Sequence, residues 1–515
     1  MLEASHRRLL SVLLLLLPAC GETASPPPQS FLIQDATIVD GTGSPGYIGS
    51  LRVANGVIAE VAANDGDNAL SPARGEPVHD AAGLVLAPGF TDTHSHHDGG
   101  LLEEPTALAA VSQGITTIVA GQDGGSRFPI IDFFAALDSA PAAVNVASYA
   151  GHGTLRRRVM GDDFRREATE AEVAEMQALL EGELADGALG LSTGLEYDPG
   201  IYASTGEVVA LARTAAAADG RYISHMRSED RALLEAVEET IEIARLARLP
   251  VQISHFKLAA RGLWGRAAEI LARLDRARAE GLDISADVYP YEYWQSTMTV
   301  LFPERDFTDR EAARYALEEL VAPDGMIIAR FGADTTLEGM TLAQIAARRG
   351  TDPVTTYIDL IAESRAARAE GRDGSESIVA TSMDFDDIAT LMSWPHTNIS
   401  SDGGLRGAHP RGFGAYPRVL SRYVREAGRL GLEEAVHKMT ALAARHMGLA
   451  GRGVLEPGAA ADMVLFDPAT VLDRATTAQP HLTAAGIERV WVAGTVVYEE
   501  GAVTGALPGV VLRRR

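Results

Sequence analysis

The chain has 515 residues, of which 46% are hydrophobic and 22% charged, an ordinary composition for a folded protein that excludes global disorder. At roughly 100–200 residues per domain, this length predicts two or three domains rather than a single core. The 45 basic and 70 acidic residues leave a net charge of −25, which argues against a nucleic-acid partner because phosphates require a basic face.

The first twenty residues have the features of a bacterial lipoprotein signal. Two arginines precede an apolar run, residues 9–17, which is too short to span a bilayer but suits a secretory signal. The run ends in Leu-Pro-Ala-Cys, which resembles a lipobox, and Cys20 is the only cysteine of the chain. We therefore expect a signal peptide over residues 1–19 and a lipidated Cys20 that begins an extended tether over residues 20–30. The alternative is an ordinary signal cleaved nearby, with an incidental cysteine.

A lipidated cysteine predicts an exported protein anchored in a bacterial cell envelope, facing the periplasm or the exterior. No other apolar run reaches spanning length, so the lipid is the only membrane contact that we expect. A single cysteine also excludes a disulfide framework and a cysteine-based zinc site. The sequence does not determine the membrane leaflet or the oligomeric state.

The residues after the tether fall into two regimes. Short β-like runs and turns dominate residues 31–87, whereas apolar β-runs alternate with helical patterns over residues 88–446. Such alternation is typical of a parallel sheet built from βα units, and eight runs are the number that closes a (β/α)8 barrel. The eight runs are residues 89–93, 116–120, 144–149, 188–192, 222–224, 251–254, 284–288 and 397–400.

Two further segments complete the predicted architecture. Residues from about 297 to 380 separate the seventh and eighth runs and are predicted to be an insertion with helices of its own. Short β-runs return over residues 447–515, and we expect them to pair with residues 31–87 in a β-sandwich. The sequence thus predicts an α/β protein, a (β/α)8 barrel with a flanking β-sandwich domain built from both chain ends and an insertion between strands 7 and 8.

Histidines and aspartates directly follow five of the eight predicted strands. His94 and His96 come after the first run and, being two residues apart, project to the same side of a strand. The others are Asp123 after the second run, His225 after the fifth, His255 after the sixth and Asp402 after the eighth. Strand carboxyl ends converge at one mouth of a β/α barrel, so we expect a single pocket. Each residue alone is compatible with a purely structural role, as a capping aspartate or a hydrogen-bonded histidine. Together, their side chains are ligands that suit Zn²⁺ and related divalent ions.

Eight motifs occur in order along the mature chain: PGFTDTHSH (88–96), GHGTLRRRVMG (151–161), GALGLSTGLEYDPGIYAST (187–205), YISHMRSE (222–229), VQISHFK (251–257), DVYPY (287–291), SSDGG (400–404) and HPRGFGAYPRVL (409–420). They resemble the D-aminoacylase (N-acyl-D-amino-acid deacylase) branch of the amidohydrolase superfamily. The segment GVLEPGAAADMVLFDP (453–468) is similar to the point where that superfamily returns to its β-sandwich. The resemblance covers nearly the whole mature chain.

The resemblance implies metal-dependent hydrolysis of N-acyl-D-amino acids to a carboxylate and a free D-amino acid. It assigns a metal-activated water as the nucleophile and Asp402 as the general base and acid. It also implies one tightly held zinc ion, and leaves open a second, weaker site that shares a ligand with the first. The tight site would use Asp123, His225 and His255, and the weaker site His94, His96 and Asp123.

The predicted ligand set departs from the family pattern at Asp123. The family usually carries a metal-binding cysteine in a Gly-Asn-Cys-Gly context, whereas this chain reads Gly-Gln-Asp-Gly. An aspartate is a harder ligand than a thiolate, so Mn²⁺ and Co²⁺ stay open beside Zn²⁺. The carboxylated lysine that many relatives use after the fourth strand is excluded, because the chain has only Lys257 and Lys438.

The substrate carboxylate needs a cation, and Lys257 lies two residues beyond His255 in a chain whose other basic residues, apart from Lys438, are all arginines. Arg411 and Tyr289 are similar to the family's remaining carboxylate contacts. Tyr197 is a candidate donor to the scissile carbonyl oxygen, and Ser296 is a weaker substrate-binding candidate. Structural roles for these last two residues are equally compatible with the sequence.

Three further polar residues, His97, Asp98 and His152, are expected to orient the metal ligands. The partner of the site is then a small N-acyl-D-amino acid, whose side chain and acyl group the sequence does not define.

Two other functions stay open from the sequence. One is a different amide or cyclic-amide hydrolase of the superfamily, similar to a hydantoinase, which has no need of Lys257 and Arg411 together. The other is a non-catalytic lipoprotein that binds a metal or a solute. The presence of Asp402 beside a complete ligand set argues against the second alternative.

Overall fold

The structure is a computed structural model that describes residues 30–65 and 69–514. The predicted signal segment and Cys20 lie outside the described residues. Within those ranges no helix combines the length and the apolar character needed to cross a membrane.

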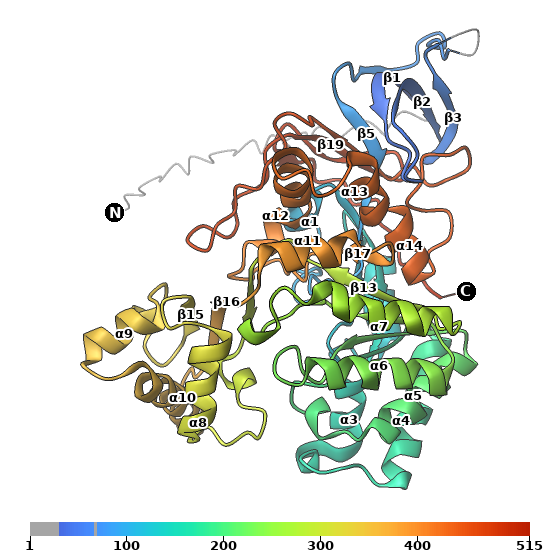
Figure 1. Ribbon diagram of the computed structural model, residues 1–515. Helices are drawn as coiled ribbons and strands as arrows, with labels where there is room; N and C mark the ends of the chain where they lie inside the picture. Colours follow the sequence, from blue (N-terminus) through green and yellow to red (C-terminus); the bar gives the residue numbers. More distant parts are fainter. Residues whose placement is uncertain (1–29, 66–68, 515) are drawn as a thin grey trace, which may run out of the picture.

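A closed barrel of parallel strands lies at the centre of the molecule (Figure 1). One sheet joins β6 (Phe90–Asp92), β7 (Ile115–Ala120) and β8 (Asn145–Ser148), and a second joins β9 (Ala150–Gly151), β10 (Gly190–Gly194), β11 (Arg221–His225), β12 (Val251–Ile253), β13 (Ile284–Val288) and β17 (Thr397–Ile399). β8 and β9 belong to one run that is interrupted at Tyr149, and a parallel bridge from Ser95 to Gly403 joins the two outer strands. All eight predicted runs therefore contribute strands, and the predicted (β/α)8 fold is confirmed.

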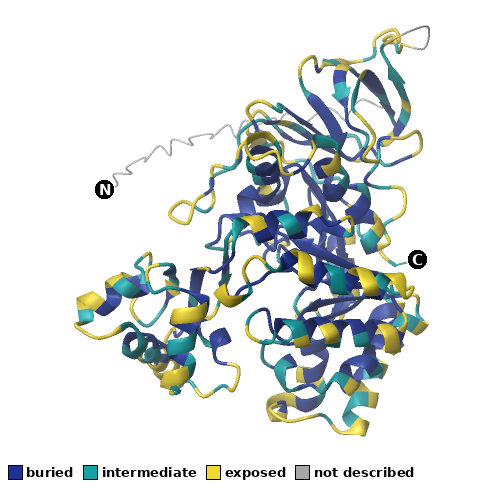
Figure 2. Cartoon of the chain, viewed as in Figure 1, coloured by how far each residue is buried: buried dark blue, intermediate teal, exposed yellow. Residues whose placement is uncertain are grey.

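Helices connect the strands and cover the outside of the barrel. They are α1 (Leu108–Val111), α2 (Ile130–Ser139), α3 (His152–Met160), α4 (Glu170–Ala185), α5 (Thr205–Ala217), α6 (Leu233–Ala247), α7 (Ala267–Ala279), α11 (Phe385–Ser393), α12 (Arg411–Arg418), α13 (Leu432–Met439) and α14 (Ala441–Met447). The start of α4 is set by a capping box, in which the Thr169 hydroxyl accepts from the Glu172 amide and the Glu172 carboxylate accepts from the Thr169 amide. Burial is concentrated on the strands and the inner helix faces, while the outer helix faces are exposed (Figure 2).

Both ends of the chain meet in one nine-stranded sheet. Its strands are β1 (Ser30–Ile38), β2 (Tyr47–Ala54), β3 (Val57–Ala63), β4 (Val78–Asp80), β5 (Val85–Pro88), β18 (Met463–Phe466), β19 (Ile487–Val492), β20 (Thr495–Glu499) and β21 (Ala502–Val503). The two ends join where β18 pairs antiparallel with β5. Residues from both ends, including Phe31, Leu51, Met463 and Trp491, pack in one buried apolar cluster. This β domain flanks the barrel (Figure 1).

The insertion forms a separate lobe beside the barrel (yellow in Figure 1). Its antiparallel sheet has the order β14 (Tyr293–Ser296), β16 (Glu376–Thr381), β15 (Met326–Phe331). Its helices are α8 (Arg310–Tyr315), α9 (Leu342–Arg349) and α10 (Pro353–Ala369). The lobe begins at β14, a few residues before the predicted start near 297. The sequence did not indicate this strand, because the short segment Tyr-Trp-Gln-Ser has no apolar run and is held as a strand by pairing with β16.

Candidate metal centre and active site

The barrel brings the predicted histidines and aspartates to the carboxyl ends of its strands. His94 and His96 follow β6, and Asp123 follows β7. His225 is the last residue of β11, while His255 and Asp402 lie in the loops after β12 and β17. Five of these six residues line one cavity of about 370 Å³, and His94 is fully buried beneath it.

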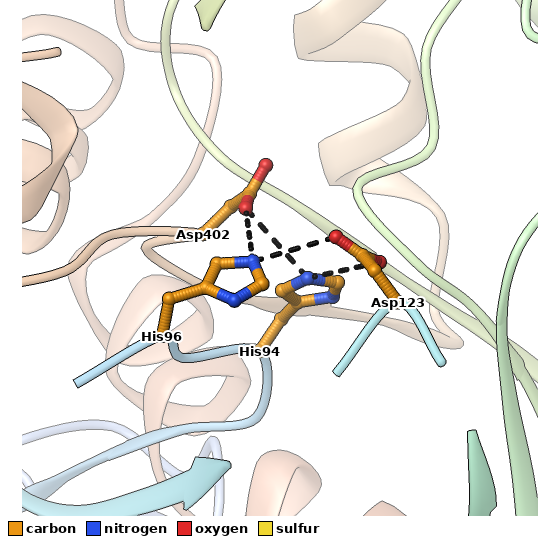
Figure 3. Close-up of side chains that lie close together, drawn as sticks. All are labelled: His94, His96, Asp123 and Asp402. Atoms are coloured by element: carbon orange, nitrogen blue, oxygen red, sulfur yellow. Dashed lines mark ion pairs between the residues drawn. The ribbon is translucent and has the colours of Figure 1, made fainter. Parts of the chain in front are cut away.

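The first group of potential ligands comprises His94, His96, Asp123 and Asp402. Figure 3 shows both imidazoles pointing between the two carboxylates. His94 Nε2 lies 3.4 Å from Asp123 Oδ1, and His96 Nε2 lies 3.4 Å from Asp123 Oδ2. Asp402 Oδ1 closes the group at 3.2 Å from His96 Nε2 and 3.6 Å from His94 Nε2.

The second group comprises Asp123, His225 and His255. His255 Nε2 lies 3.4 Å from Asp123 Oδ1 and 2.9 Å from His225 Nδ1. Within each group the ligand atoms lie within 4.8 Å of one another. Asp123 is common to both groups, which is the arrangement required for two cations that share a carboxylate ligand.

The donor set fits a divalent cation. Both ring nitrogens of His94 and Oδ1 of Asp123 are buried without a hydrogen-bond partner among the described residues. Buried polar atoms in proteins are normally paired, so these unpaired atoms are available to a bound ion. Nitrogen and oxygen donors from histidine and aspartate are those that Zn²⁺ accepts.

The electrostatics of the cluster also favour a cation. Burial lowers the pKa of His96, but Asp123 and Asp402 outweigh this effect and raise it to about 10. For His255, burial and Lys257 lower the pKa, whereas Glu229 and Asp123 raise it to about 10. The surrounding carboxylates thus stabilise positive charge at these imidazoles. A divalent cation would supply that charge and release the protons, since metal ligands bind as neutral imidazoles.

Three residues of the site have a backbone conformation that favours glycine. Asp123, His255 and Asp402 have φ angles of 53°, 32° and 48°. Such conformations cost about 1–3 kcal/mol each and persist only where the surroundings enforce them. The His255 amide donates to Asp287 Oδ1 at 2.8 Å, and the Asp402 amide donates to the His94 carbonyl at 2.9 Å. The barrel therefore holds these loops in one geometry.

Asp402 forms an ion pair with Arg411 at the mouth of the barrel. Arg411 Nη1 lies 2.6 Å from its Oδ2. Burial raises the pKa of Asp402, but Arg411 and His96 lower it well below the usual range. Arg411 therefore stabilises the carboxylate form of Asp402.

Three predicted carboxylate-binding residues converge beside the metal groups. Lys257 is only 4% exposed, and its Nζ donates to both carboxylate oxygens of Glu229 at 2.6 Å. The guanidinium of Arg411 and the ammonium of Lys257 lie 4.8 and 5.8 Å from the centre of the Tyr289 ring. The hydroxyl of Tyr289 is buried with no hydrogen-bond partner among the described residues. We call Lys257, Tyr289 and Arg411 the anion subsite.

The two weaker candidates lie on different walls of the cavity. The ring of Tyr197 lies 4.4 Å from that of His225, centre to centre, and burial raises the pKa of the phenol well above its usual range. Tyr197 is therefore a protonated donor next to the second metal group. Ser296 lies at the end of β14 in the insertion and lines the cavity from that side.

Two glutamates at the site were missed by the sequence analysis. Glu229 contacts Lys257 and also lies 2.9 Å from His255 Nδ1, and Glu196 lies 2.8 Å from His225 Nε2. Carboxylates in these positions fix the orientation of the metal-binding imidazoles. The available signal was their position, since Glu229 follows His225 by four residues and Glu196 follows β10.

The prediction that His152 orients a metal ligand is wrong. His152 is the first residue of α3, and its Nε2 lies 2.8 Å from Glu207, which also pairs with Arg156. The imidazole therefore contacts a carboxylate in the first turn of α5 and not one of the predicted metal ligands. His97 and Asp98 stay close to the site, with His97 Nδ1 2.6 Å from the hydroxyl of Ser95.

Comparisons with known proteins agree with this geometry. The sequence profile described as the amidohydrolase family matches residues 77–498. A D-aminoacylase of Alcaligenes xylosoxydans xylosoxydans is 37% identical, over 95% of this chain and 98% of its own, and an N-acyl-D-aspartate deacylase of the same organism is 38% identical, over 95% and 96%. A crystal structure of N-acyl-D-glutamate deacylase from Bordetella bronchiseptica, complexed with zinc and a phosphonate inhibitor, matches with a TM-score of 0.82 and 36% identity, over 94% of this chain and 99% of that chain.

Proposed function

Because the chain belongs to the amidohydrolase family, we propose that it is a metal-dependent N-acyl-D-amino-acid deacylase. The reaction is hydrolysis of the amide bond of an N-acyl-D-amino acid to a carboxylate and a free D-amino acid. The observation that carries this proposal is the position of the anion subsite directly beside the two metal groups that share Asp123. A relative crystallised with zinc supports zinc as the cofactor.

The roles of the side chains follow from their positions. When bound, the divalent ion supplies Lewis-acid polarisation of the scissile carbonyl and lowers the pKa of the attacking water. Lys257, Tyr289 and Arg411 hold the substrate carboxylate, while the phenol of Tyr197 donates to the carbonyl oxygen as negative charge develops there. Asp402 accepts the proton of the water and passes it to the leaving amine.

The anion subsite also separates this function from that of a cyclic-amide hydrolase. A cyclic amide carries no free carboxylate next to the scissile bond, so it would leave Lys257 and Arg411 without a substrate partner. An N-acyl amino acid uses both.

The proposed activity is tested by hydrolysis of N-acetyl-D-amino acids and their L-enantiomers by the zinc-loaded protein. We expect release of free amino acid from the D-series, at a rate at least about tenfold above that for the L-series, because inversion at Cα moves the scissile amide away from the metal when the carboxylate stays bound. Absence of hydrolysis of either series with Zn²⁺, Mn²⁺ or Co²⁺ would contradict the assignment.

We also propose that the protein is exported and anchored to the bacterial cell envelope through a lipid on Cys20. The lipobox-like Leu-Pro-Ala-Cys sequence supports this localisation. In a bacterial expression host supplied with labelled palmitate, we expect label on the wild-type protein and none on the Cys20→Ala variant, with unchanged deacylase activity. Label on both proteins or on neither would contradict lipidation at Cys20.

A further inference from the structure

A second cavity, of about 700 Å³, lies between the barrel and the insertion and is rich in arginine. Arg157 lies in α3 and Arg165 follows that helix, while Arg365 and Arg368 lie in α10 of the insertion. Arg305 is the fifth arginine of the lining, which has only two acidic residues. The chain as a whole carries a net charge of −25, so this positive charge is a local feature. We call Arg157, Arg165, Arg365 and Arg368, with the cavity that they line, the arginine cleft.

The four arginines of the cleft have no carboxylate partner. Within residues 30–65 and 69–514, none of their nitrogens lies within 4.0 Å of an aspartate or glutamate oxygen. Two of them contact backbone carbonyls instead, since Arg157 donates to that of Asp198 at 3.1 Å and Arg368 to that of Gly374 at 2.8 Å. A guanidinium has five N–H donors, so most of these donors stay available to a ligand.

The two acidic residues of the lining do not neutralise this charge. Asp198 is already paired with Arg305, whose Nε lies 3.0 Å from its Oδ1. Glu376 accepts from the Met298 amide at 2.7 Å, and burial raises the pKa of its carboxyl group, which disfavours the charged form. The cleft therefore presents a surplus of positive charge.

Aromatic rings position three of these arginines. The guanidinium carbons of Arg157 and Arg165 lie 4.5 and 4.7 Å from the centre of the Phe164 ring. That of Arg365 lies 4.7 Å from the centre of the Phe307 ring on the insertion side. A cation over an aromatic ring is held by the ring quadrupole and keeps its full charge and its hydrogen-bond donors. The rings thus orient the guanidinium groups without neutralising them, which favours binding of an anion between the two sides of the cleft.

The cleft meets the active-site cavity at Tyr197, Thr297 and Val300, which line both cavities. Tyr197 follows β10, whereas the anion subsite lies after β12, β13 and β17. With the substrate carboxylate at the anion subsite and the carbonyl oxygen at Tyr197, the acyl chain begins next to Tyr197, because it is bonded to the carbonyl carbon. The D-side chain is bonded to Cα and begins next to the carboxylate instead. The acyl chain is therefore the part of the substrate that leads to the arginine cleft.

From these contacts we infer that the arginine cleft binds an anionic group at the far end of the acyl chain. The preferred substrates are then D-amino acids acylated by one carboxyl group of a dicarboxylic acid. The inference rests on the proposed function and names the class of acyl group. The reaction itself is the same, since water adds to the carbonyl carbon, the amide C–N bond breaks, and the products are a dicarboxylate and the free D-amino acid.

The first test is the kcat/KM of the zinc-loaded wild-type protein for the N-succinyl, N-glutaryl and N-adipyl derivatives of one D-amino acid, the one whose N-acetyl derivative is hydrolysed fastest. Each is compared with its terminal carboxamide, which has nearly the same shape but no charge. We expect at least one carboxylate to be preferred by about 10–100-fold, the range for hydrogen bonds to charged groups, and the preference to fall as salt is added. Equal values within all three pairs would overturn the inference and leave the deacylase function intact. If no N-acetyl-D-amino acid is hydrolysed either, both fail.

The second test removes one cation from each side of the cleft. In the double variant Arg165→Gln/Arg365→Gln, both changes at exposed positions, the preference for the carboxylate over the carboxamide should fall at least about tenfold. The matched control, Arg348→Gln, removes an exposed arginine of α9 outside the cleft and should keep the wild-type preference. A folded double variant with the wild-type preference would show that the cleft does not receive the acyl carboxylate. A double variant that instead changes the preference between N-acetyl-D-glutamate and N-acetyl-D-glutamine would assign the cleft to the side chain and overturn the inference.

Discussion

Replacement of Asp402 by asparagine is expected to lower kcat for an N-acetyl-D-amino acid by about 10²–10⁴-fold, the usual contribution of a general acid–base group. Asparagine has nearly the same shape but cannot accept the proton of the water. The tight metal group of Asp123, His225 and His255 does not include Asp402, so bound zinc should stay at the wild-type level.

The measurement is kcat together with metal content by mass spectrometry on the same preparation. The conservative variant Asp402→Glu is the matched control, since it keeps the carboxylate and should retain more activity than asparagine. If the asparagine variant keeps its metal and also keeps kcat within threefold of wild type, Asp402 is not the proton-transfer group.

Replacement of Lys257 by methionine is expected to affect both stability and substrate binding. Methionine removes the partner of the buried Glu229 carboxylate, whose pKa burial raises and Lys257 lowers. Leaving one charge of a buried pair without its partner typically costs about 3–5 kcal/mol. Loss of the cation at the anion subsite should also raise KM by about 10–100-fold, the range for hydrogen bonds to charged groups.

The double variant Lys257→Met/Glu229→Gln separates these two effects. It removes the unpaired charge, so the free energy of unfolding should return most of the way to the wild-type value, while KM stays high. Unfolding by denaturant and steady-state kinetics on the two variants provide both quantities. A KM that returns to normal in the double variant would show that Lys257 supports the fold and does not bind the substrate carboxylate.

Much of this arrangement could be predicted because it depends on position along regular elements. Parallel strands of a barrel end at one mouth, so His94, Asp123, His225 and Asp402 could be placed together from their positions after apolar runs alone. The capping box at the start of α4 could likewise be predicted, because it depends only on Thr169 and Glu172, which are three positions apart.

The remainder depends on contacts between segments that are distant in the sequence. The pairing of Lys257 with Glu229 and of Arg411 with Asp402 is set by how separate loops fold over the mouth. His152 was expected to orient a metal ligand, but its Nε2 lies 2.8 Å from Glu207 in α5. The strand Tyr293–Ser296 has no periodic signal, so the start of the insertion could not be derived from the pattern.

The central claim is that one divalent cation, held by Asp123, His225 and His255, is required for hydrolysis. The most direct measurement is the zinc content of the purified protein, followed by deacylase activity after chelation and after stepwise return of zinc. We predict close to one tightly bound ion per chain, loss of activity as that ion is removed and recovery as the first equivalent is returned. A protein that is free of divalent metal and hydrolyses N-acyl-D-amino acids equally well with or without chelator would contradict the account.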